Sequence, residues 1–523
     1  MNQSVDAVII GAGHNSLACA LHLAAKGWSV AVFEQAGEAG GAVRTGAYTL
    51  PGFRHDWAAM NLSLFAGSAF FKAYGDSLSA RGLEFVPVSK PFASAFPDGR
   101  WLGVCTDAEA TTARIRAFSA TDAETWNRLL AAFPGEAEQI FALLGSPMRN
   151  HALAGFLFRL WRKRGVGGAL DLGRFLLQTP RDWLGQTFES AHLQAMLGAW
   201  GLHLDFAPDI AGGALFPYLE AMAGQSFGMI IGKGGADTII RAMQAEVEAR
   251  GGTVECNAPV ARILHDGGQA TGVELADGRR ITARKAVIAN VAPRALVRLT
   301  GGTGNAGFDS AMTGFDHAPG TMMIHLALDS LPDWAAGEEL KSFAYVHLAP
   351  SLDQMARTYA QAKAGLLPDE PVIVAGQPTV VDPSRAPEGK HVLWLQVRMV
   401  PGVIKGDAGG TITATDWAGA TAPMAERALD ILERYAPDTR AKILGQRIVP
   451  PSELEAENPN LVGGDQVCGS HHLAQNFLFR PARGHADGST PIGKLHLTGA
   501  AVWPGAGTGA GAGYHLARKL AGN

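Results

Sequence analysis

The chain is poor in cysteine, balanced in charge and free of long apolar runs, and each of these features argues against a class of protein. Its four cysteines, at positions 19, 105, 256 and 468, form no CxxC pair. A disulfide framework, a structural zinc site and a redox-active cysteine pair are therefore not expected, and a reducing compartment fits. The 44 basic and 48 acidic residues leave a net charge of -4, so we expect no nucleic-acid partner, because such partners need a basic face.

Membrane insertion and secretion are not expected either. No apolar run approaches the ~20 residues of a membrane span, and the first strand begins too early to leave room for a signal peptide. The chain does have length and apolar content, with 523 residues and 47% hydrophobic side chains. A length of 523 residues exceeds what one hydrophobic core usually supports. We therefore expect a cytoplasmic protein with at least two domains.

The opening stretch "VDAVIIGAGHNSLACALHLAAKGWSVAVFE" predicts a strand, a helix and a second strand. The expected bounds are 5–10, 14–26 and 28–33. Gly11 permits the turn out of the first strand, and Gly13 lets a pyrophosphate approach the helix N-terminus, which His14 and Asn15 begin. Glu34 ends the second strand, where a carboxylate accepts ribose hydroxyls. The pattern predicts a dinucleotide site, and the alternative is a glycine-rich turn without a ligand.

One position departs from the fingerprint, because Ser16 stands where a third glycine is expected. That glycine mainly allows the helix to pack closely on the strand. Serine is small enough to keep this packing, and its hydroxyl can also bind a phosphate. We therefore include Ser16 among the cofactor-binding residues.

Two further stretches favour FAD over NAD, because the first resembles the glycine-doublet extension of flavoproteins and the second complements it. In "QAGEAGGAVRT", Gln35 follows the acid, Gly40 and Gly41 let a second loop close over the diphosphate, and Arg44 neutralises its charge. Near the C-terminus, "LHLTGAAVWPGAGTGAGAG" predicts a strand, a glycine-rich loop and a helix. We expect that loop to lie against the flavin, with the backbone near Val260 at the adenine. Its cofactor-binding residues would be Gly499, Pro504, Gly507 and Thr508.

The strand–helix–strand texture appears at the start, in the middle and at the end of the chain, and a different texture separates these pieces. We predict an α/β fold with a discontinuous, Rossmann-like FAD-binding domain, formed by residues 1–67, 226–300 and 480–523. Residues 68–225 and 301–479 would form an inserted substrate domain with helices around 120–200. In that domain, "TMMIHLALDSL" and "HVLWLQVRMV" alternate as expected for a sheet with one covered face.

Over nearly its whole length, the chain resembles the phytoene desaturase-like FAD-dependent oxidoreductases. The stretches "GAGHNSL", "PGFRHDW", "GGDQVCGSHHLAQNFLFRP" and "PGAGTGAGAG" are most similar to the pyridine nucleotide-disulphide oxidoreductase domain-containing protein 2 group. Ala42 departs from the arginine that many relatives carry after the glycine doublet, which makes Arg44 the diphosphate partner. The resemblance implies extended FAD and hydride transfer between flavin N5 and a substrate carbon.

The resemblance also implies that "PGFRHDWAAMN" runs close to the flavin ring. We take His55 and Asp56 as catalytic candidates and Trp57 and Asn61 as substrate contacts, with Trp503 opposite. His55 would titrate near neutral pH and move a proton, or it would only hydrogen-bond a turn. For Asp56, anchoring of the loop is the alternative to chemistry.

Three further histidines and an arginine are candidates. His471 and His472 are adjacent, so on a strand only one of them faces a pocket, and we expect substrate contact from one and no metal site. His472 is the catalytic candidate and His471 the substrate contact. His325 would line the substrate sheet or be a satisfied core histidine. Arg398 would also line this sheet, and a salt bridge is the alternative role.

The stretch 156–165, "FLFRLWRKRG", combines aromatic and basic side chains. From Phe156 to Gly165 it predicts a helix that either docks on an anionic membrane or contacts another subunit, so the oligomeric state stays open. No second dinucleotide fingerprint is present, and electrons would leave to oxygen, a quinone or another external acceptor.

The leading hypothesis is an FAD-dependent oxidoreductase acting on a carbon–carbon bond of a hydrophobic, polyene-like or isoprenoid-like substrate, by desaturation or its reverse. Amine or alcohol oxidation and a redox-neutral isomerisation are alternatives on the same fold. A flavin-bearing interaction protein with little turnover is a third possibility.

Overall fold

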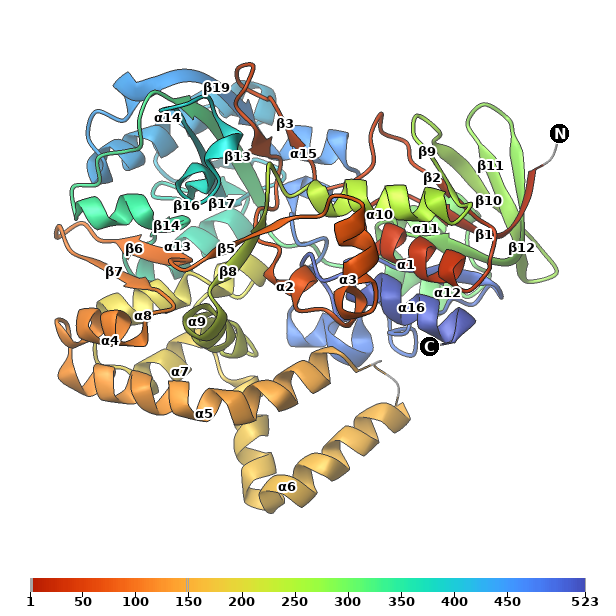
Figure 1. The fold of residues 1–523 in the computed structure, drawn as a ribbon, viewed down its shortest axis with the longest axis horizontal. Helices are drawn as coiled ribbons and strands as arrows, with labels where there is room; N and C mark the ends of the chain where they lie inside the picture. Colours follow the sequence, from red (N-terminus) through yellow and green to blue (C-terminus); the bar gives the residue numbers. More distant parts are fainter. Residues whose placement is uncertain (1–2, 147, 149, 523) are drawn as a thin grey trace.

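The computed structural model describes residues 3–146, 148 and 150–522 and builds an α/β fold around two large sheets. Figure 1 shows them side by side, with a layer of helices beneath the left-hand sheet, which is called the second sheet below. Both ends of the chain lie beside the first sheet. The predicted fold class is confirmed.

The first sheet has the order β10–β11–β12–β1–β2–β9, with β20 beside β12. Its central pairs are parallel, and the strands nearest the centre are buried on both faces, as expected for a sheet covered on both sides. Segments from the start, the middle and the end of the chain thus contribute to one sheet. Its strands are β1 (Gln3–Ile10), β2 (Val30–Phe33), β9 (Thr253–Glu255), β10 (Val260–Asp266), β11 (Gln269–Leu275), β12 (Arg280–Ala289) and β20 (Leu495–Leu497).

Helices α1 (His14–Ala25), α10 (Thr238–Ala249) and α16 (Gly511–Ala521) pack together on this sheet. α1 and α16 approach so closely that a Cβ on Gly513 would lie 1.9 Å from the Asn15 carbonyl oxygen. Glycine is therefore required at that crossing. The expected helix at 14–26 is found, and Lys26 caps it.

The second sheet has the order β19–β13–β17–β16–β14–β6–β7. β13 is buried along its whole length, so the expectation of a sheet with one covered face is wrong. α14 (Trp417–Tyr435) shares a core with one face, and α8 (Ala191–Gly198) and α9 (Leu215–Phe227) share a core with the other. The strands are β6 (Phe92–Ala95), β7 (Trp101–Val104), β13 (Gly320–Leu328), β14 (Tyr345–Leu348), β16 (Val372–Gly376), β17 (His391–Val400) and β19 (Ile443–Val449).

Short two-stranded ribbons lie outside these two sheets. They pair β3 (Thr45–Gly46) with β4 (His55–Asp56), β5 (Phe85–Val88) with β8 (Met229–Gly232), and β15 (Leu366–Leu367) with β18 (Gly406–Asp407). The first of these ribbons directly follows Arg44 and contains two of the catalytic candidates, so it is central to the site below.

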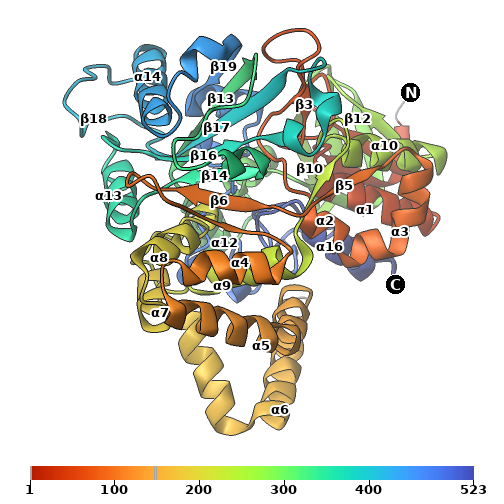
Figure 2. The same ribbon diagram turned by 60° about the vertical axis from the view of Figure 1, so that its left-hand side comes forward.

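Long helices project below the second sheet. Figure 2 shows α5 (Ala120–Leu144) and α6 (Asn150–Leu177) extending away from the body, with α6 bent at Gly165. No helix among the described residues is long and apolar enough to cross a membrane. The remaining helices are α2 (Ser63–Ala66), α3 (Ala69–Ala80), α4 (Ala108–Arg116), α7 (Pro180–Thr187), α11 (Pro293–Thr300), α12 (Ala306–Thr313), α13 (Leu352–Lys363) and α15 (Pro451–Glu457), with a short 3₁₀ helix η1 (Gly201–Leu204).

Candidate functional site

The turn after β1 leaves the N-terminus of α1 open to a ligand. Gly11 has a φ of +86°, which favours glycine, and α1 begins after Gly13 without any side-chain cap. Other helices are capped by side chains such as Ser68, Asp107 and Ser119. The first-turn amides of a helix need acceptors, and an anion at this end satisfies them.

Glu34 lies at the mouth of this turn. Its carboxylate accepts hydrogen bonds from the amides of Ala12 at 2.7 Å and Ala36 at 2.9 Å. The Glu34 carbonyl accepts from the amide of Ala258, which brings the start of β10 at Val260 to the same edge. An open pocket of about 540 Å³ adjoins the acid and is lined by Gln35, Ala36, Gly37, Glu38, Arg44, Ala456 and Glu457.

The glycine doublet folds back onto the fingerprint turn. The Gly40 amide donates to the Ala12 carbonyl at 3.0 Å, and Gly40 and Gly13 form a parallel bridge. A Cβ on Gly40, whose φ is +131°, would lie 2.5 Å from the Val43 carbonyl oxygen. The doublet loop therefore depends on glycine to reach the dinucleotide turn, with Gly41 beside Gly13.

Arg44 is a buried cation with unused donors. It is 8% exposed, and its Nε and Nη2 have no hydrogen-bond partner among the described residues. Only Nη1 approaches carboxylates, at 3.3 Å from Glu457 and 3.6 Å from Glu38. A diphosphate beside the turn would accept from the two unused nitrogens.

The C-terminal loop joins the same place. Gly499 has a φ of +98°, and a Cβ there would lie 2.0 Å from Oδ1 of Asn290. The Thr498 hydroxyl is buried without a partner, and α16 begins after Ala510 without a side-chain cap. The uncapped N-terminus of α16 and the unpaired Thr498 hydroxyl therefore lie beside the uncapped N-terminus of α1.

His14, Asn15 and Thr508 hold these segments together. His14 Nε2 lies 3.1 Å from the Gly507 carbonyl oxygen, and Asn15 Oδ1 accepts from the Gly513 amide at 3.2 Å. The Thr508 hydroxyl donates to the Asn61 carbonyl at 2.9 Å. Burial lowers the pKa of His14 to about 4, so this imidazole brings no positive charge to the turn.

Taken together, these residues fit FAD. A dinucleotide requires acceptors for ribose hydroxyls and donors for a diphosphate, and Glu34, Arg44 and the uncapped α1 and α16 supply both. The Ser16 hydroxyl accepts from Asn290 Nδ2 at 2.9 Å, which leaves its O–H as a donor, so a phosphate contact by Ser16 stays a prediction. This serine links α1 to the end of β12.

The β3–β4 ribbon carries His55 and Asp56. The Asp56 carboxylate accepts from the Thr45 hydroxyl at 2.7 Å and the Ala236 amide at 2.8 Å, and it pairs with Arg385. These contacts correspond to the anchoring alternative. Thr49 lies 2.8 Å from His55 Nε2, and burial lowers the pKa of His55 to about 4, below the neutral range expected from the sequence.

An aromatic group follows the ribbon. His325 from β13 lies with its ring centroid 5.3 Å from His55, 6.0 Å from Trp57 in a stacked arrangement and 5.6 Å from Tyr48. Arg44 lies over the Trp57 ring at 5.2 Å. Neither nitrogen of His325 nor the Trp57 indole nitrogen has a partner, so His325 is not a satisfied core histidine. We call Tyr48, His55, Trp57 and His325 the aromatic group.

The face of the second sheet that continues from the aromatic group is unusually polar. Trp394, Gln396 and Arg398 alternate along β17 on the side of His325, and Tyr345 and His347 do so along β14. We call this side of the sheet the polar face. Arg398 contacts no carboxylate in the part of the chain that is described, and its nitrogens bind Gln396 and the carbonyls of Leu202 and His203. The salt bridge considered for Arg398 is therefore not found.

His471 and His472 face different partners. His471 Nε2 accepts from the Ala506 amide in the C-terminal loop at 3.0 Å. His472 Nε2 lies 2.8 Å from the Asp205 carbonyl oxygen and 3.3 Å from the Tyr359 hydroxyl. The structure brings only His471 to the cofactor loop, so the catalytic role given to His472 and the substrate contact given to His471 stay predictions.

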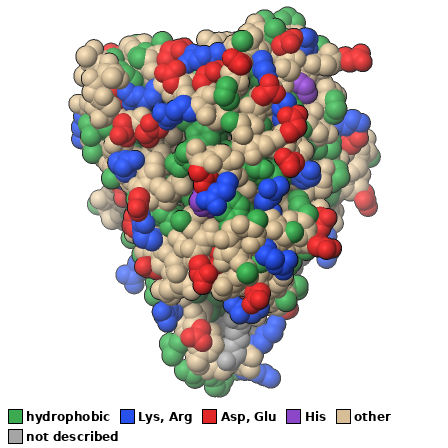
Figure 3. Space-filling view, turned by 90° about the vertical axis from the view of Figure 1, so that its left-hand side faces the viewer, with side chains coloured by type: hydrophobic (Ala, Val, Ile, Leu, Met, Phe, Trp, Pro, Cys, Tyr) green, Lys and Arg blue, Asp and Glu red, His purple; other side chains and the backbone are tan. Residues whose placement is uncertain are grey.

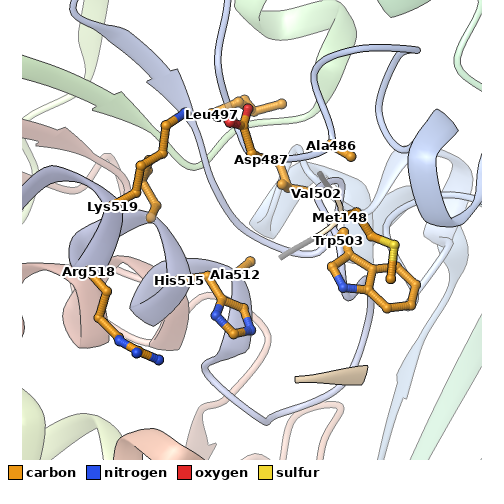
Figure 4. A pocket seen from close by; sticks show the side chains of 11 residues that line it. Met148, Ala486, Asp487, Leu497, Val502, Trp503, Ala512, His515, Arg518 and Lys519 are labelled. Atoms are coloured by element: carbon orange, nitrogen blue, oxygen red, sulfur yellow. Dashed lines mark hydrogen bonds and ion pairs between the residues drawn. The ribbon is translucent and has the colours of Figure 1, made fainter. Parts of the chain in front are cut away.

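Trp503 and Pro504 lie within this loop, between β20 and α16. The Trp503 ring stacks on Phe477 at 5.1 Å, and its nitrogen donates to the Ser146 carbonyl at 2.9 Å. It lines a cavity of about 190 Å³ between α16 and the loops before and after β20 (Figure 4). Its contacts include no member of the aromatic group, so a substrate role for Trp503 stays a prediction, and Pro504 packs near Gly511.

Sequence reasoning missed several residues of the site. Asn290 directly follows the parallel strand β12, and the rule that ligands meet the carboxyl ends of parallel strands points to it. Glu220 on α9 carries a carboxylate that no hydrogen bond or ion pair joins to another described residue, and burial raises its pKa to about 7. Nothing in the local sequence distinguishes Glu220, because its surroundings come from distant segments.

Comparisons with known proteins agree with this geometry. A sequence model described as "Flavin containing amine oxidoreductase" matches residues 17–405. The "Pyridine nucleotide-disulfide oxidoreductase domain-containing protein 2" of Rattus norvegicus is 28% identical, over 98% of this chain and 92% of that protein. A "Phytoene desaturase (lycopene-forming)" of Paracoccus sp. is 26% identical, over 96% of this chain and 94% of its own length. A solved putrescine oxidase triple mutant superimposes with a TM-score of 0.62 at 17% identity, covering 100% of this chain and 98% of that one.

Proposed function

Because the chain belongs to the flavin containing amine oxidoreductase family and is an FAD-dependent oxidoreductase, we propose that it transfers hydride between FAD and a carbon atom of a hydrophobic, isoprenoid-like substrate. The observation that carries this proposal is the contact between Arg44, beside the cofactor turn, and Trp57 of the aromatic group. Bound FAD supplies the redox chemistry by accepting or returning a hydride at N5. The likeness to a phytoene desaturase supports a carbon–carbon bond as the reacting group.

The chain's own residues exclude water and orient the substrate. Trp57, Met60, Met222, Met323 and Trp394 are each at most 4% exposed and belong to one hydrophobic cluster between the second sheet and the helices. Burial keeps the imidazoles of His55 and His325 uncharged. An apolar substrate with uncharged neighbours gains from such desolvated surroundings.

We propose that residues 1–67, 226–300 and 480–523 form the FAD-binding domain and the rest the substrate domain. Electrons would leave the reduced protein to an external acceptor such as oxygen or a quinone, in the cytoplasm or at a membrane surface. The proposal of an external acceptor rests on the sequence, in which a single dinucleotide fingerprint is found and is assigned to FAD.

Anaerobic mixing tests the proposed reaction. Purified holoprotein is mixed without oxygen with phytoene, with putrescine, with a long-chain alcohol and with reduced nicotinamides, and the flavin absorption band is followed. We expect bleaching by the polyene alone. Bleaching by the amine or alcohol would move the protein to those oxidases. Conversion of the polyene without lasting bleaching would indicate isomerisation. A flavin that no compound reduces, in a protein that binds a partner protein stoichiometrically, would favour an interaction protein with little turnover.

We propose Glu220 of α9, whose charge acts on Tyr345 of the polar face, as the acceptor of the substrate proton. Because its pKa is raised to about 7 by burial, the deprotonated fraction rises about tenfold between pH 6 and 8 for a single ionisation. We therefore expect the rate of flavin reduction to rise by about that factor over this range. In Glu220→Gln the rate should fall by about 10²–10⁴ and lose this dependence. Glu109→Gln, on the exposed start of α4, is the control, and an unchanged profile in Glu220→Gln would remove Glu220 from the mechanism.

We propose that α6 docks on an anionic membrane. Phe158 and Trp161 are 55% and 50% exposed, with exposed Arg162 and Lys163 beside them. The side chains at 156, 157, 159, 160 and 164 lie outside the described part. Figure 3 shows basic and hydrophobic side chains at the narrow end of the molecule, where α6 lies, together with some acidic ones, and Lys163 pairs with Glu138 of α5 at 3.0 Å. Aromatic and basic side chains on one helix suit an anionic interface.

Vesicle sedimentation tests this docking. We expect binding to phosphatidylserine-containing vesicles that weakens with salt. The double variant Phe158→Ser/Trp161→Ser should bind at least about tenfold more weakly. Burial of each ring in the membrane contributes roughly 1.5–3 kcal/mol to the free energy of binding. Val403→Ser, an exposed apolar residue elsewhere, is the control. Equal binding of the double variant, or a dimer that this variant dissociates, would favour the subunit-contact alternative.

A further inference from the structure

We propose that the end of the polar face around His347 and Arg398 binds a carboxylate at one end of the substrate. Arg398 would be its charged partner, with His203, His347 and Trp200 as neutral ones. This inference rests on the proposed function, because it names the substrate class of that same site. Hydrophobic chain and carboxylate would then lie along one face of the second sheet.

Several buried polar atoms that have no hydrogen-bond partner in the described part of the chain meet at this end of the sheet. They are Nε1 of Trp200, Nε2 of His203, both ring nitrogens of His347 and Nε of Arg398. The ring centroids of Trp200 and His203 lie 4.6 Å apart, and those of His347 lie 5.1 Å from Trp200 and 5.4 Å from His203. Buried polar groups are almost always hydrogen-bonded. The presence of this many unpaired atoms in one cluster therefore indicates a ligand.

Arg398 adds an uncompensated charge to this cluster. It is 6% exposed, and its hydrogen bonds go to Gln396 and to two backbone carbonyls, none of which is charged. Burial lowers the pKa of Arg398 to about 10, which still leaves it protonated at neutral pH. A buried cation is costly unless an anion contacts it.

The two carboxylates whose charge acts on Arg398 do not contact it. Asp465 accepts hydrogen bonds from the amides of Ala318, Val467 and Gly469. Asp205 lies 3.3 Å from His472, and its carboxylate oxygens are buried without a hydrogen-bond partner among the described residues. Both act on Arg398 only through their field, so the contact position beside Nε is left to a ligand.

The chemistry of the cluster selects an oxygen acceptor. Indole and guanidinium N–H groups only donate, and burial lowers the pKa of His203 and brings that of His347 to about 3, so neither imidazole is protonated. An amine would be repelled by Arg398, and a hydrocarbon would leave every donor unpaired. A carboxylate offers two acceptor oxygens and the missing charge.

The position of the cluster suits one end of a long molecule. Arg398 is four residues from Trp394, and Trp394 is paired in register with His325 of the aromatic group. At about 3.3 Å per residue this separates the two positions by roughly 13 Å. Gln396 lies between them and bonds both Arg398 and the carbonyl of Ala58, next to Trp57.

Binding of matched ligands to the holoprotein tests the inference. Geranylgeranoic acid, its methyl ester and phytoene are titrated while tryptophan fluorescence and melting temperature are recorded. The acid should bind about 10- to 100-fold more tightly than the ester, the effect of a charge-assisted hydrogen bond. Arg398→Met should remove this preference while leaving ester affinity nearly unchanged, and Arg262→Met, on an exposed strand, should keep it.

His347→Leu is a second variant, because it deletes two unpaired nitrogens and breaks no existing hydrogen bond. It should weaken the acid about tenfold, even where Arg398→Met fails to fold. Equal affinity for acid and ester, or acid binding unchanged in both variants, would mean that the unpaired atoms serve ordered water alone. If phytoene still bleaches the flavin in that case, the proposed function stands and only the carboxylate site is contradicted. If none of the three compounds binds or bleaches the flavin, both proposals are contradicted.

Discussion

Gly13→Leu is expected to give a folded protein that purifies without its yellow colour. Gly13 has a φ of -70°, which any residue adopts, and the nearest atom to an added Cβ is Asn290 Nδ2 at 3.3 Å. The backbone therefore tolerates a side chain here, at the cost of a small shift. A leucine would instead fill the space in front of the α1 amides, where the diphosphate is expected. Each charge-assisted hydrogen bond lost there costs about 1.5–3 kcal/mol, so FAD affinity should fall by at least about a hundredfold.

The measurement is the ratio of flavin to protein absorbance after purification, followed by titration with FAD. Circular dichroism and the melting temperature of the flavin-free protein report whether the fold survives. Gly185→Leu is the matched control, since a Cβ on Gly185 in α7 meets nothing within 4 Å, and this variant should remain yellow. A yellow Gly13→Leu protein with normal FAD affinity would place the diphosphate elsewhere.

Local pattern was sufficient to predict the cofactor turn. Gly11, Gly13 and Glu34 act through backbone geometry and a strand end, which a few neighbouring residues determine, and the expected strand, helix and strand are found with small shifts at their ends. FAD, the α/β fold and the family followed from these stretches together with the glycine doublet and the C-terminal loop.

Residues whose roles depend on distant partners were not predicted. His14 and Asn15 bond the C-terminal segment almost five hundred positions away, which no local pattern shows, and their contact with the cofactor stays a prediction. The alternation along β17 did not reveal that helices cover both faces of the sheet. The neutral pH titration expected of His55 failed because burial among segments far apart in sequence determines its pKa.

Arg385 shows the same limit most clearly, because nothing in the sequence marked it and the structure gives it a central place. It is fully buried, pairs with Asp56 and with Asp382 at 3.1 Å, and donates to the Gly232 carbonyl at 2.6 Å. Asp56 belongs to the β3–β4 ribbon and Gly232 to the end of β8, whereas Asp382 lies three residues before Arg385. Arg385 thus fixes the ribbon that follows Arg44 and bears His55, and through it the aromatic group.

Arg385→Met is therefore expected to lower the free energy of unfolding by about 3–5 kcal/mol, because two buried carboxylates lose their cation. Urea denaturation followed by circular dichroism measures this loss, and flavin fluorescence should show that FAD is released at a lower urea concentration than in the wild type. Arg279→Met, which removes an exposed arginine paired with Glu255 and Asp277, should leave the urea midpoint close to that of the wild type, because solvent-exposed ion pairs contribute little to stability. Adding Asp56→Asn to Arg385→Met should cost less than the sum of the single changes, since it removes one unpaired charge. Additive losses, or an Arg385→Met midpoint equal to that of Arg279→Met, would show that this network does not hold the ribbon.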